Sequence, residues 1–398
     1  MRAIPVLAVA LSAGLVVALG AAYAPPVGAP AEGITRAELG RLLFWDPILS
    51  GPKDVACASC HHPDFAYADG RALSLGTGSV GLGPNRVDAS GGDIPVVPRN
   101  SPTILNTAFN GIREGQGDGL TNIRVPSERL DASGASAAPM FWDNRVQSLE
   151  LQALEPLKVR EEMRGDAFPE EVAIDSIVAR LRAIPGYVQR FEEAFGPTEG
   201  ISAVQLAQAI AEFERTLVAT DSPFDRFQAG EQGALTPQEL RGRQAFEDAN
   251  CTLCHSGPML SDFSLRADGV PEHPLLTVAD EGDGRFRFRT PSLRNVALTA
   301  PYMHNGMLET LEDVLRFYDR RRSENPNVAD RPRRPTEIAN GGPSASLDWD
   351  FRFLNDVTEG NIQDIISFLE ALTDSDFDRT IPTSVPSGLA PGGALASR

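Results

Sequence analysis

The four cysteines of this 398-residue chain fall in two copies of one pattern, CASCH at Cys57 to His61 and CTLCH at Cys251 to His255. In a helical turn, two cysteines three residues apart share one face, and the next residue presents its imidazole beside them. Two thioether bonds and one axial iron ligand can then meet at one porphyrin, which is the attachment pattern of c-type haem. A zinc site or a redox dithiol would leave both histidines unexplained. The sequence therefore predicts two haem c groups, held by Cys57, Cys60, His61, Cys251, Cys254 and His255.

The sixth ligand of each iron separates an electron carrier from an enzyme, because a ferric haem with an open position can bind peroxide. No histidine lies between residues 63 and 254, and His62 follows its neighbouring ligand too closely to reach the other face of that porphyrin. We therefore expect the first haem to be open. The alternatives are ligation by Met140, Met163, Lys53 or Lys158.

Several residues could supply the sixth ligand of the second haem. The candidates are His273, Tyr302, Met303, His304, Met307 and Tyr318. Since methionine is the commoner partner of histidine in cytochromes c, the residues alone favour a methionine. Tyr318 has the helical spacing of Leu311 and Leu315, after Thr310 as a helix cap, so it should face inward. An inward tyrosine could be a core residue with a hydrogen-bonded hydroxyl or a phenolate bound to iron.

Short helices joined by long Pro- and Gly-rich loops must position these residues, so the expected fold class is all-α with long irregular loops. A helix from about Thr35 to Trp45 precedes the first motif, and one capped by Thr236 precedes the second. Further helices are expected at about 175–195, 202–219 and 361–372. The irregular stretches 63–99 and 110–139 are candidate walls of a haem pocket or partner surface.

The motifs and the composition along the chain together predict its domain organisation. We expect a signal peptide at residues 1–24, haem c domains at 30–230 and 231–377, and a disordered tail at 378–398. The first 24 residues combine one early arginine, an apolar run and small residues, as in exported proteins. A retained membrane anchor is the alternative. After cleavage we expect a periplasmic protein with no transmembrane segment.

The net charge of −18 and an isoelectric point near 4.8 argue against nucleic acid and favour a partner with a basic docking surface. Lys53 and Lys158 are the only lysines, so nearly every cationic side chain is an arginine. The guanidinium fork suits carboxylates, including those of a cofactor.

The chain resembles the bacterial di-haem cytochrome c peroxidase superfamily and, most closely, its MauG-like branch. The similarity covers nearly the whole mature chain and rests on these motifs: GRLLFWDPILSG, RNSPTILN, FWDNRVQSLELQALEPLKVREEM, SPFDRFQAG, CTLCHSGP, RTPSLRNVALTAPYMHNG and LEDVLRFYD. It implies two all-helical cytochrome c-like domains with one calcium ion between them. FWDNR and LEPLK followed by EEMRG are also similar to a sub-branch that includes a methanobactin-operon enzyme.

The resemblance implies roles for individual residues. Trp142 matches the tryptophan between the haems, and the distal pocket of the first haem is matched by Gln152, Pro156 and Glu162. Tyr318 matches the tyrosine that replaces the peroxidases' methionine as sixth ligand. The calcium site is matched by Asn100, Thr299 and Pro301.

Some positions depart from the family pattern. Asn144 and Glu155 stand where glycine is usual, and the loop at 110–139 is expanded. These departures bear on the identity of the partner and leave the haem chemistry unaffected.

The resemblance implies a hydrogen peroxide-dependent oxidoreductase that oxidises a Trp or Tyr side chain of a partner protein through a high-valent di-haem state. Glu162 would move the proton that peroxide cleavage requires, and Gln152 would orient the peroxide. Trp142 would pass one oxidising equivalent between the haems. The alternatives are a cytochrome c peroxidase supplied with electrons by a small cytochrome c or cupredoxin, and a non-catalytic di-haem carrier.

Overall fold

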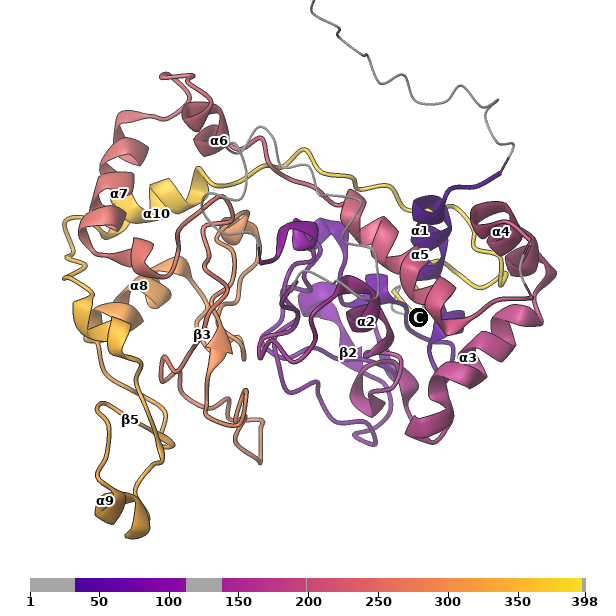
Figure 1. The fold of residues 1–398 in the computed structure, drawn as a ribbon, viewed down its shortest axis with the longest axis horizontal. Coiled ribbons are helices and arrows are strands. Elements are labelled where there is room, and N and C mark those ends of the chain that lie inside the picture. Colours follow the sequence, from indigo (N-terminus) through magenta and orange to yellow (C-terminus); the bar gives the residue numbers. More distant parts are fainter. Residues whose placement is uncertain (1–32, 112–137, 198, 396–398) are drawn as a thin grey trace, which may run out of the picture. The chain divides into compact units, whose positions relative to one another are not determined.

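Helices form most of the regular structure in the computed structural model, which describes residues 33–111, 138–197 and 199–395 (Figure 1). Their bounds are α1 Arg36–Trp45, α2 Leu149–Leu154, α3 Ala173–Arg182, α4 Pro185–Phe195, α5 Ala203–Thr216, α6 Pro223–Gln228, α7 Pro237–Asp248, α8 Leu311–Arg320, α9 Pro335–Ala339 and α10 Ile362–Glu370.

Each strand of the described chain has two residues. The antiparallel pairs are β1 Ser79–Val80 with β2 Val87–Asp88 and β3 Leu265–Arg266 with β4 Phe288–Arg289; the parallel pair is β5 Val328–Ala329 with β6 Ala345–Ser346. Each strand pair joins two loop segments and belongs to a two-stranded sheet, so the expectation of a predominantly helical fold holds for the described residues.

Local capping signals placed the helix starts correctly. The Thr35 hydroxyl accepts from the Glu38 amide at 3.2 Å, while the Glu38 carboxylate accepts from the Thr35 amide at 2.7 Å. Such a capping box satisfies amides that a helix start leaves unpaired. The same arrangement begins α7 at Thr236 and α8 at Thr310. The single stretch expected at 175–195 is instead two helices, because Pro185 cannot donate the amide bond that would continue α3.

The helix that precedes each CxxCH motif crosses a helix that follows the motif, and the two crossings are similar. Helix α1 packs on α5, and α7 packs on α10. A Cβ on Gly40 would lie 1.9 Å from the Ala209 carbonyl oxygen, and one on Gly242 would lie 1.8 Å from that of Asp364. Glycine therefore permits each close crossing. One large apolar core contains residues of α1, α3, α4 and α5, and another contains residues of α7, α8 and α10.

The chain after α10 returns to the first half of the sequence, beside α1 (Figure 1). The Tyr67 hydroxyl donates to the Asp378 carbonyl at 2.7 Å, and the Ser387 hydroxyl donates to the Asp46 carboxylate at 2.6 Å. Val385 is buried. The disorder expected for residues 378–398 is therefore wrong for 378–395, because specific hydrogen bonds and an apolar anchor fix a segment whose composition is typical of disorder.

Some expectations fall outside the described residues, namely the signal peptide at 1–24 and most of the loop at 110–139. Within the described ranges, no helix has the length and apolar character needed to cross a membrane. Residues from Ile34 onward form one compact unit by their contacts.

Candidate haem sites

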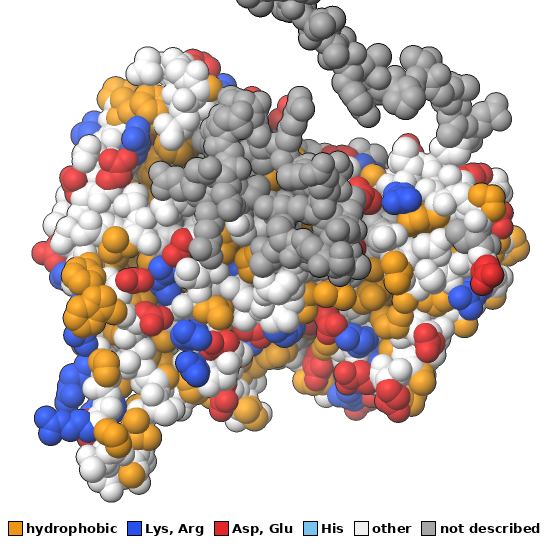
Figure 2. Space-filling model, viewed as in Figure 1, with side chains coloured by type: hydrophobic (Ala, Val, Ile, Leu, Met, Phe, Trp, Pro, Cys, Tyr) orange, Lys and Arg blue, Asp and Glu red, His pale blue; other side chains and the backbone are white. Residues whose placement is uncertain are grey.

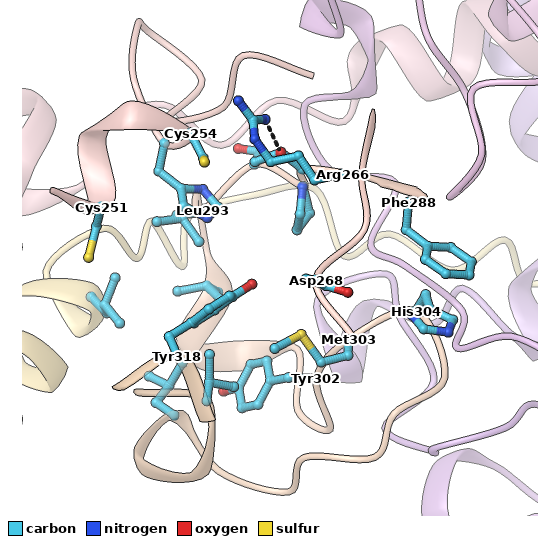
Figure 3. A pocket seen from close by; sticks show the side chains of 18 of the residues that line it. Cys251, Cys254, Arg266, Asp268, Phe288, Leu293, Tyr302, Met303, His304 and Tyr318 are labelled. Carbon is cyan, nitrogen blue, oxygen red and sulfur yellow. Dashed lines mark hydrogen bonds between the residues drawn. The ribbon is translucent and has the colours of Figure 1, made fainter. Parts of the chain in front are cut away.

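The second CxxCH motif lies at the wall of a cavity, which we call the second cavity (Figure 3). Cys251, Cys254 and His255 all line it. The Nδ1 atom of His255 lies 3.0 Å from the Leu260 carbonyl oxygen, which leaves Nε2 available to a metal. Burial lowers the pKa of His255 to about 4, so its imidazole is neutral at pH 7, as ligation requires.

The structure narrows the candidate sixth ligands of the second haem. Of the six, the second cavity is lined by Tyr302, Met303, His304 and Tyr318, whereas His273 and Met307 do not line it. His304 stacks on Phe288 with ring centroids 3.5 Å apart. Met303 and Tyr318 both remain geometrically possible.

Tyr318 faces this cavity from α8, with its hydroxyl directed inward (Figure 3). Its ring stacks on Phe351 at 5.9 Å between centroids. The side chain is partly buried, and its hydroxyl makes no hydrogen bond with any residue in the described ranges, so it is open to a group in the cavity. Burial, with the nearby Asp268 carboxylate, raises the pKa of Tyr318. A cation in the cavity would favour the phenolate and give this oxygen a partner.

The first CxxCH motif lines a different cavity, the first cavity, together with the distal residues expected from the resemblance. Its wall includes Cys57, Cys60, His61, Trp142, Gln152, Pro156 and Glu162. The Nδ1 atom of His61 lies 3.0 Å from the Tyr67 carbonyl oxygen, which orients this imidazole in the manner of His255. Of the alternative ligands, Met140 and Met163 line this cavity, and Lys53 and Lys158 do not.

Glu162 lies on a single π-helical turn, Arg160–Arg164. Such turns are rare and occur often at functional sites. Its carboxylate has no hydrogen-bond partner in the described part of the chain, and burial raises its pKa to about 7. The side chain can therefore be neutral or ionised near neutral pH, which suits a group that accepts and returns a proton.

Among the further charged residues that line the first cavity, Glu214 and Arg289 were not expected from the sequence. Glu214 on α5 is buried, its Oε2 atom has no partner, and burial raises its pKa to about 8. Arg289 on β4 is also buried. Glu214 stands in AIAEFERTL, where Glu212 and Arg215 are charged as well, so neither it nor Arg289 carried a distinct sequence signal.

The two cavities share one wall. The residues that line both are Asn100, Ser101, Pro102, Thr103, Trp142 and Arg289. The Trp142 indole donates to the Asn100 carbonyl at 2.9 Å, and the Arg289 amide donates to the Trp142 carbonyl at 2.6 Å. Trp142 therefore lies in the wall that both cavities share, and its role between two haems stays a prediction.

The structure brings two of the three expected calcium ligands together. The Asn100 side-chain amide lies 3.4 Å from the Pro301 carbonyl oxygen and 2.7 Å from that of Arg71. Thr299 lines the second cavity with them. No cluster of three or more His, Cys, Asp or Glu residues suited to a metal occurs in the described ranges. A calcium ion here would depend on neutral oxygen ligands, which Ca²⁺ accepts.

The residues present fit two covalently bound haem groups. All four cysteines are free thiols at cavity walls. Each cavity is also lined by its CxxCH histidine, whose ring is fixed by a backbone carbonyl, and by a polar side chain with no hydrogen-bond partner among the described residues, Glu162 in the first cavity and Tyr318 in the second.

Comparisons with known proteins support this interpretation. The family model for di-haem cytochrome c peroxidase matches residues 35–233. Methylamine utilization protein MauG of Methylorubrum extorquens is 31% identical over 358 residues, which cover 87% of this chain and 80% of the relative. Cytochrome c551 peroxidase of Pseudomonas aeruginosa is 34% identical over 292 residues, 70% of either protein.

A crystal structure of a MauG-like protein associated with microbial copper homeostasis gives a TM-score of 0.60 at 28% identity, covering 89% of this chain and 94% of that one. MauG proteins and peroxidases are thus similar to this chain to about the same degree. With two CxxCH motifs at two adjoining cavities, the chain belongs to the di-haem cytochrome c peroxidase family of oxidoreductases.

Proposed function

We propose that this protein uses hydrogen peroxide to oxidise a Trp or Tyr side chain of a partner protein, in the manner of the MauG-like branch. The observation that carries the proposal is the hydroxyl of the partly buried Tyr318, which faces the second cavity and has no hydrogen-bond partner in the described ranges. As a phenolate ligand of the second haem, with His255 as the other ligand, it would favour the oxidised states of the iron, whereas a methionine would favour the reduced state.

The haem groups, when bound, supply the redox chemistry, and the chain's own residues control protons and access. Glu162 accepts a proton from peroxide in its ionised form and returns it to the leaving oxygen. Gln152 lines the same cavity and would orient the peroxide by hydrogen bonding. Pro156 lines the wall beside them. Trp142, in the shared wall, is the group through which an electron passes between cavities.

The proposal includes the organisation implied by the family. Residues 30–230 and 231–377 would each bind one haem c, and one calcium ion would lie at Asn100, Thr299 and Pro301. The protein would act in the periplasm after removal of residues 1–24. Acidic and basic side chains are interspersed on the face shown in Figure 2, so a basic docking surface on the partner is supported by the net charge of −18 alone.

A second candidate is a cytochrome c peroxidase that receives electrons from a small cytochrome c or cupredoxin. It is favoured by Met303, which lines the second cavity beside Tyr318 (Figure 3). The two functions thus differ in which of these side chains binds iron.

The test compares Tyr318→Phe with Met303→Leu in the haem-loaded protein, by optical and electron paramagnetic resonance spectra of the ferric state. We expect Tyr318→Phe to change the low-spin signal of the second haem and to abolish oxidation of protein side chains by peroxide. Met303→Leu should leave both unchanged. The reverse result, or a methionine-to-iron charge-transfer band in the wild type, would replace the proposal with the peroxidase function.

A further inference from the structure

Arg289 is exceptional among the arginines of the haem cavities. Five arginines line the two cavities, and four of them form an ion pair with aspartate: Arg99 with Asp143 and Asp280, Arg145 with Asp143, Arg266 with Asp262 and Asp350, and Arg294 with Asp225. Arg289 has no carboxylate partner in the described ranges, although only 9% of it is exposed.

The protein holds Arg289 by its backbone and by one side-chain nitrogen. Its strand pairs with β3, and its amide donates to the Trp142 carbonyl. The Nε atom donates to the Phe141 carbonyl at 3.0 Å, and the guanidinium lies 5.9 Å from the centre of the Phe263 ring. The two terminal nitrogens have no protein acceptor in the described ranges. They are free to bind a group in the cavities.

An unpaired buried cation is costly, because it loses its water shell without gaining an opposite charge. Burial lowers the pKa of Arg289 to about 10, because the charged guanidinium loses hydration there. The residue lies at the wall that both cavities share. An anion that arrives with the cofactor would offset this cost, and each haem c carries two carboxylates as propionates.

We propose that Arg289 binds haem propionates from both cavities and that its charge raises the reduction potentials of both haems together. The guanidinium presents a planar fork whose donors can serve two carboxylates, which the single point charge of a lysine does less well. A positive charge near an iron favours the reduced form, which carries one positive charge fewer. The inference rests on haem occupancy alone and holds for either of the two candidate functions.

Arg289 lies next to Trp142, and the two residues would act together. Trp142 would provide the aromatic path between the cavities, and Arg289, whose amide donates to the Trp142 carbonyl, would set the reduction potentials of the haems on both sides of that path. A common cation would shift both haems in the same direction, so the driving force between them would change little while the oxidising power of the pair changes.

The test is spectroelectrochemical titration of each haem in Arg289→Gln, without peroxide or partner, after pyridine haemochrome analysis confirms two attached haems. We expect both midpoint potentials to fall, with the ferric-to-ferrous ratio at a fixed potential rising about tenfold for each haem, equivalent to about 59 mV for one electron. Arg145→Gln is the matched control, because Arg145 lines only the first cavity. It should leave the potential of the second haem unchanged.

Unchanged potentials in a fully loaded Arg289→Gln protein would overturn the inference, and a shift of one haem only would overturn the claim that Arg289 serves both. Should Arg289→Gln lose a haem, Arg289→Lys replaces it as the test. Lysine is shorter and offers a single charged nitrogen, so this variant should shift the propionate bands of both haems in resonance Raman spectra. Because the positive charge is kept, each haem should keep at least half of the rise in midpoint potential that Arg289 provides. Propionate bands identical to wild type at both haems would refute propionate binding.

Discussion

The position of Glu162 depends on a contact that only glycine allows. The π-helical turn with Glu162 lies directly against Gly76, and a Cβ at that position would lie 2.1 Å from the Glu161 carbonyl oxygen and 2.2 Å from that of Glu162. The Thr77 amide also donates to the Glu162 carbonyl at 2.8 Å. On the other side, the Gly51 amide donates to the Met163 carbonyl at 2.7 Å. The acid is therefore positioned by backbone bonds.

Substitution of Gly76 by alanine should move this turn. An ordinary contact to Cβ begins near 3.4 Å, so the turn must retreat by more than about 1 Å. A misplacement of that size at a catalytic group can cost about 100-fold in rate, and overpacking of this kind costs about 1–3 kcal/mol of stability. We expect Gly76→Ala to slow the reaction of the loaded protein with peroxide about 100-fold in stopped-flow absorbance. The matched control is Gly233→Ala, where a Cβ meets no atom within 4 Å.

A double-mutant cycle separates displacement of Glu162 from general damage. If Gly76 acts by positioning the carboxylate, then Gly76→Ala should cost almost nothing further in a Glu162→Gln background. An equal loss in both backgrounds, or a Gly76→Ala protein that carries both haems and reacts within about threefold of wild type, would refute the reasoning.

The remaining predictions concern pH, calcium and the C-terminal tail. Because the pKa of Glu162 is raised from 4.5 to about 7, the carboxylate is protonated below that value, and the rate of peroxide activation should rise with pH through about 7. Glu162→Gln should lose this rise and react at least about tenfold more slowly at pH 8, whereas the exposed Glu171→Gln should not; an unchanged profile would exclude Glu162 as the base. Exhaustive chelation should lower the reduction potentials of both haems, because it would remove a positive charge near the shared wall, and metal analysis of an untreated sample that finds no calcium would contradict the calcium site. Truncation after Thr380 removes the Ser387–Asp46 bond and several others, each worth about 1 kcal/mol, so the melting temperature should fall by several degrees. An unchanged melting curve would show that the tail does not stabilise the fold.

Features that depend on local sequence were predictable. The caps at Thr35, Thr236 and Thr310 are encoded within four residues, and each helix begins where its cap predicts. The two CxxCH motifs carry their chemistry in five residues. Helical spacing alone was enough to predict that Tyr318 faces inward from α8. The break at Pro185 was also a local signal, which the prediction of one stretch there overlooked.

Features that depend on contacts between distant residues were not predictable from one sequence. Arg289 matters because it lacks the aspartate that the other cavity arginines have, and no sequence pattern records a missing partner. Gly76 lies more than eighty residues before the Arg160–Arg164 turn, whose close packing it allows. The tail at 378–395 has the composition of a disordered segment, yet its order depends on Asp46 and Tyr67 at the other end of the chain.

The shared wall also bears on what calcium could do. The Asn100 backbone amide donates to the His304 carbonyl at 2.7 Å, and the Arg289 backbone amide donates to the Trp142 carbonyl at 2.6 Å. Arg99 forms an ion pair with Asp280 as well. These bonds join segments from the two halves of the chain without any metal. A calcium ion beside Asn100 would therefore act less as a spacer than as a second positive charge near the wall, and its removal should shift potentials in the same direction as loss of Arg289.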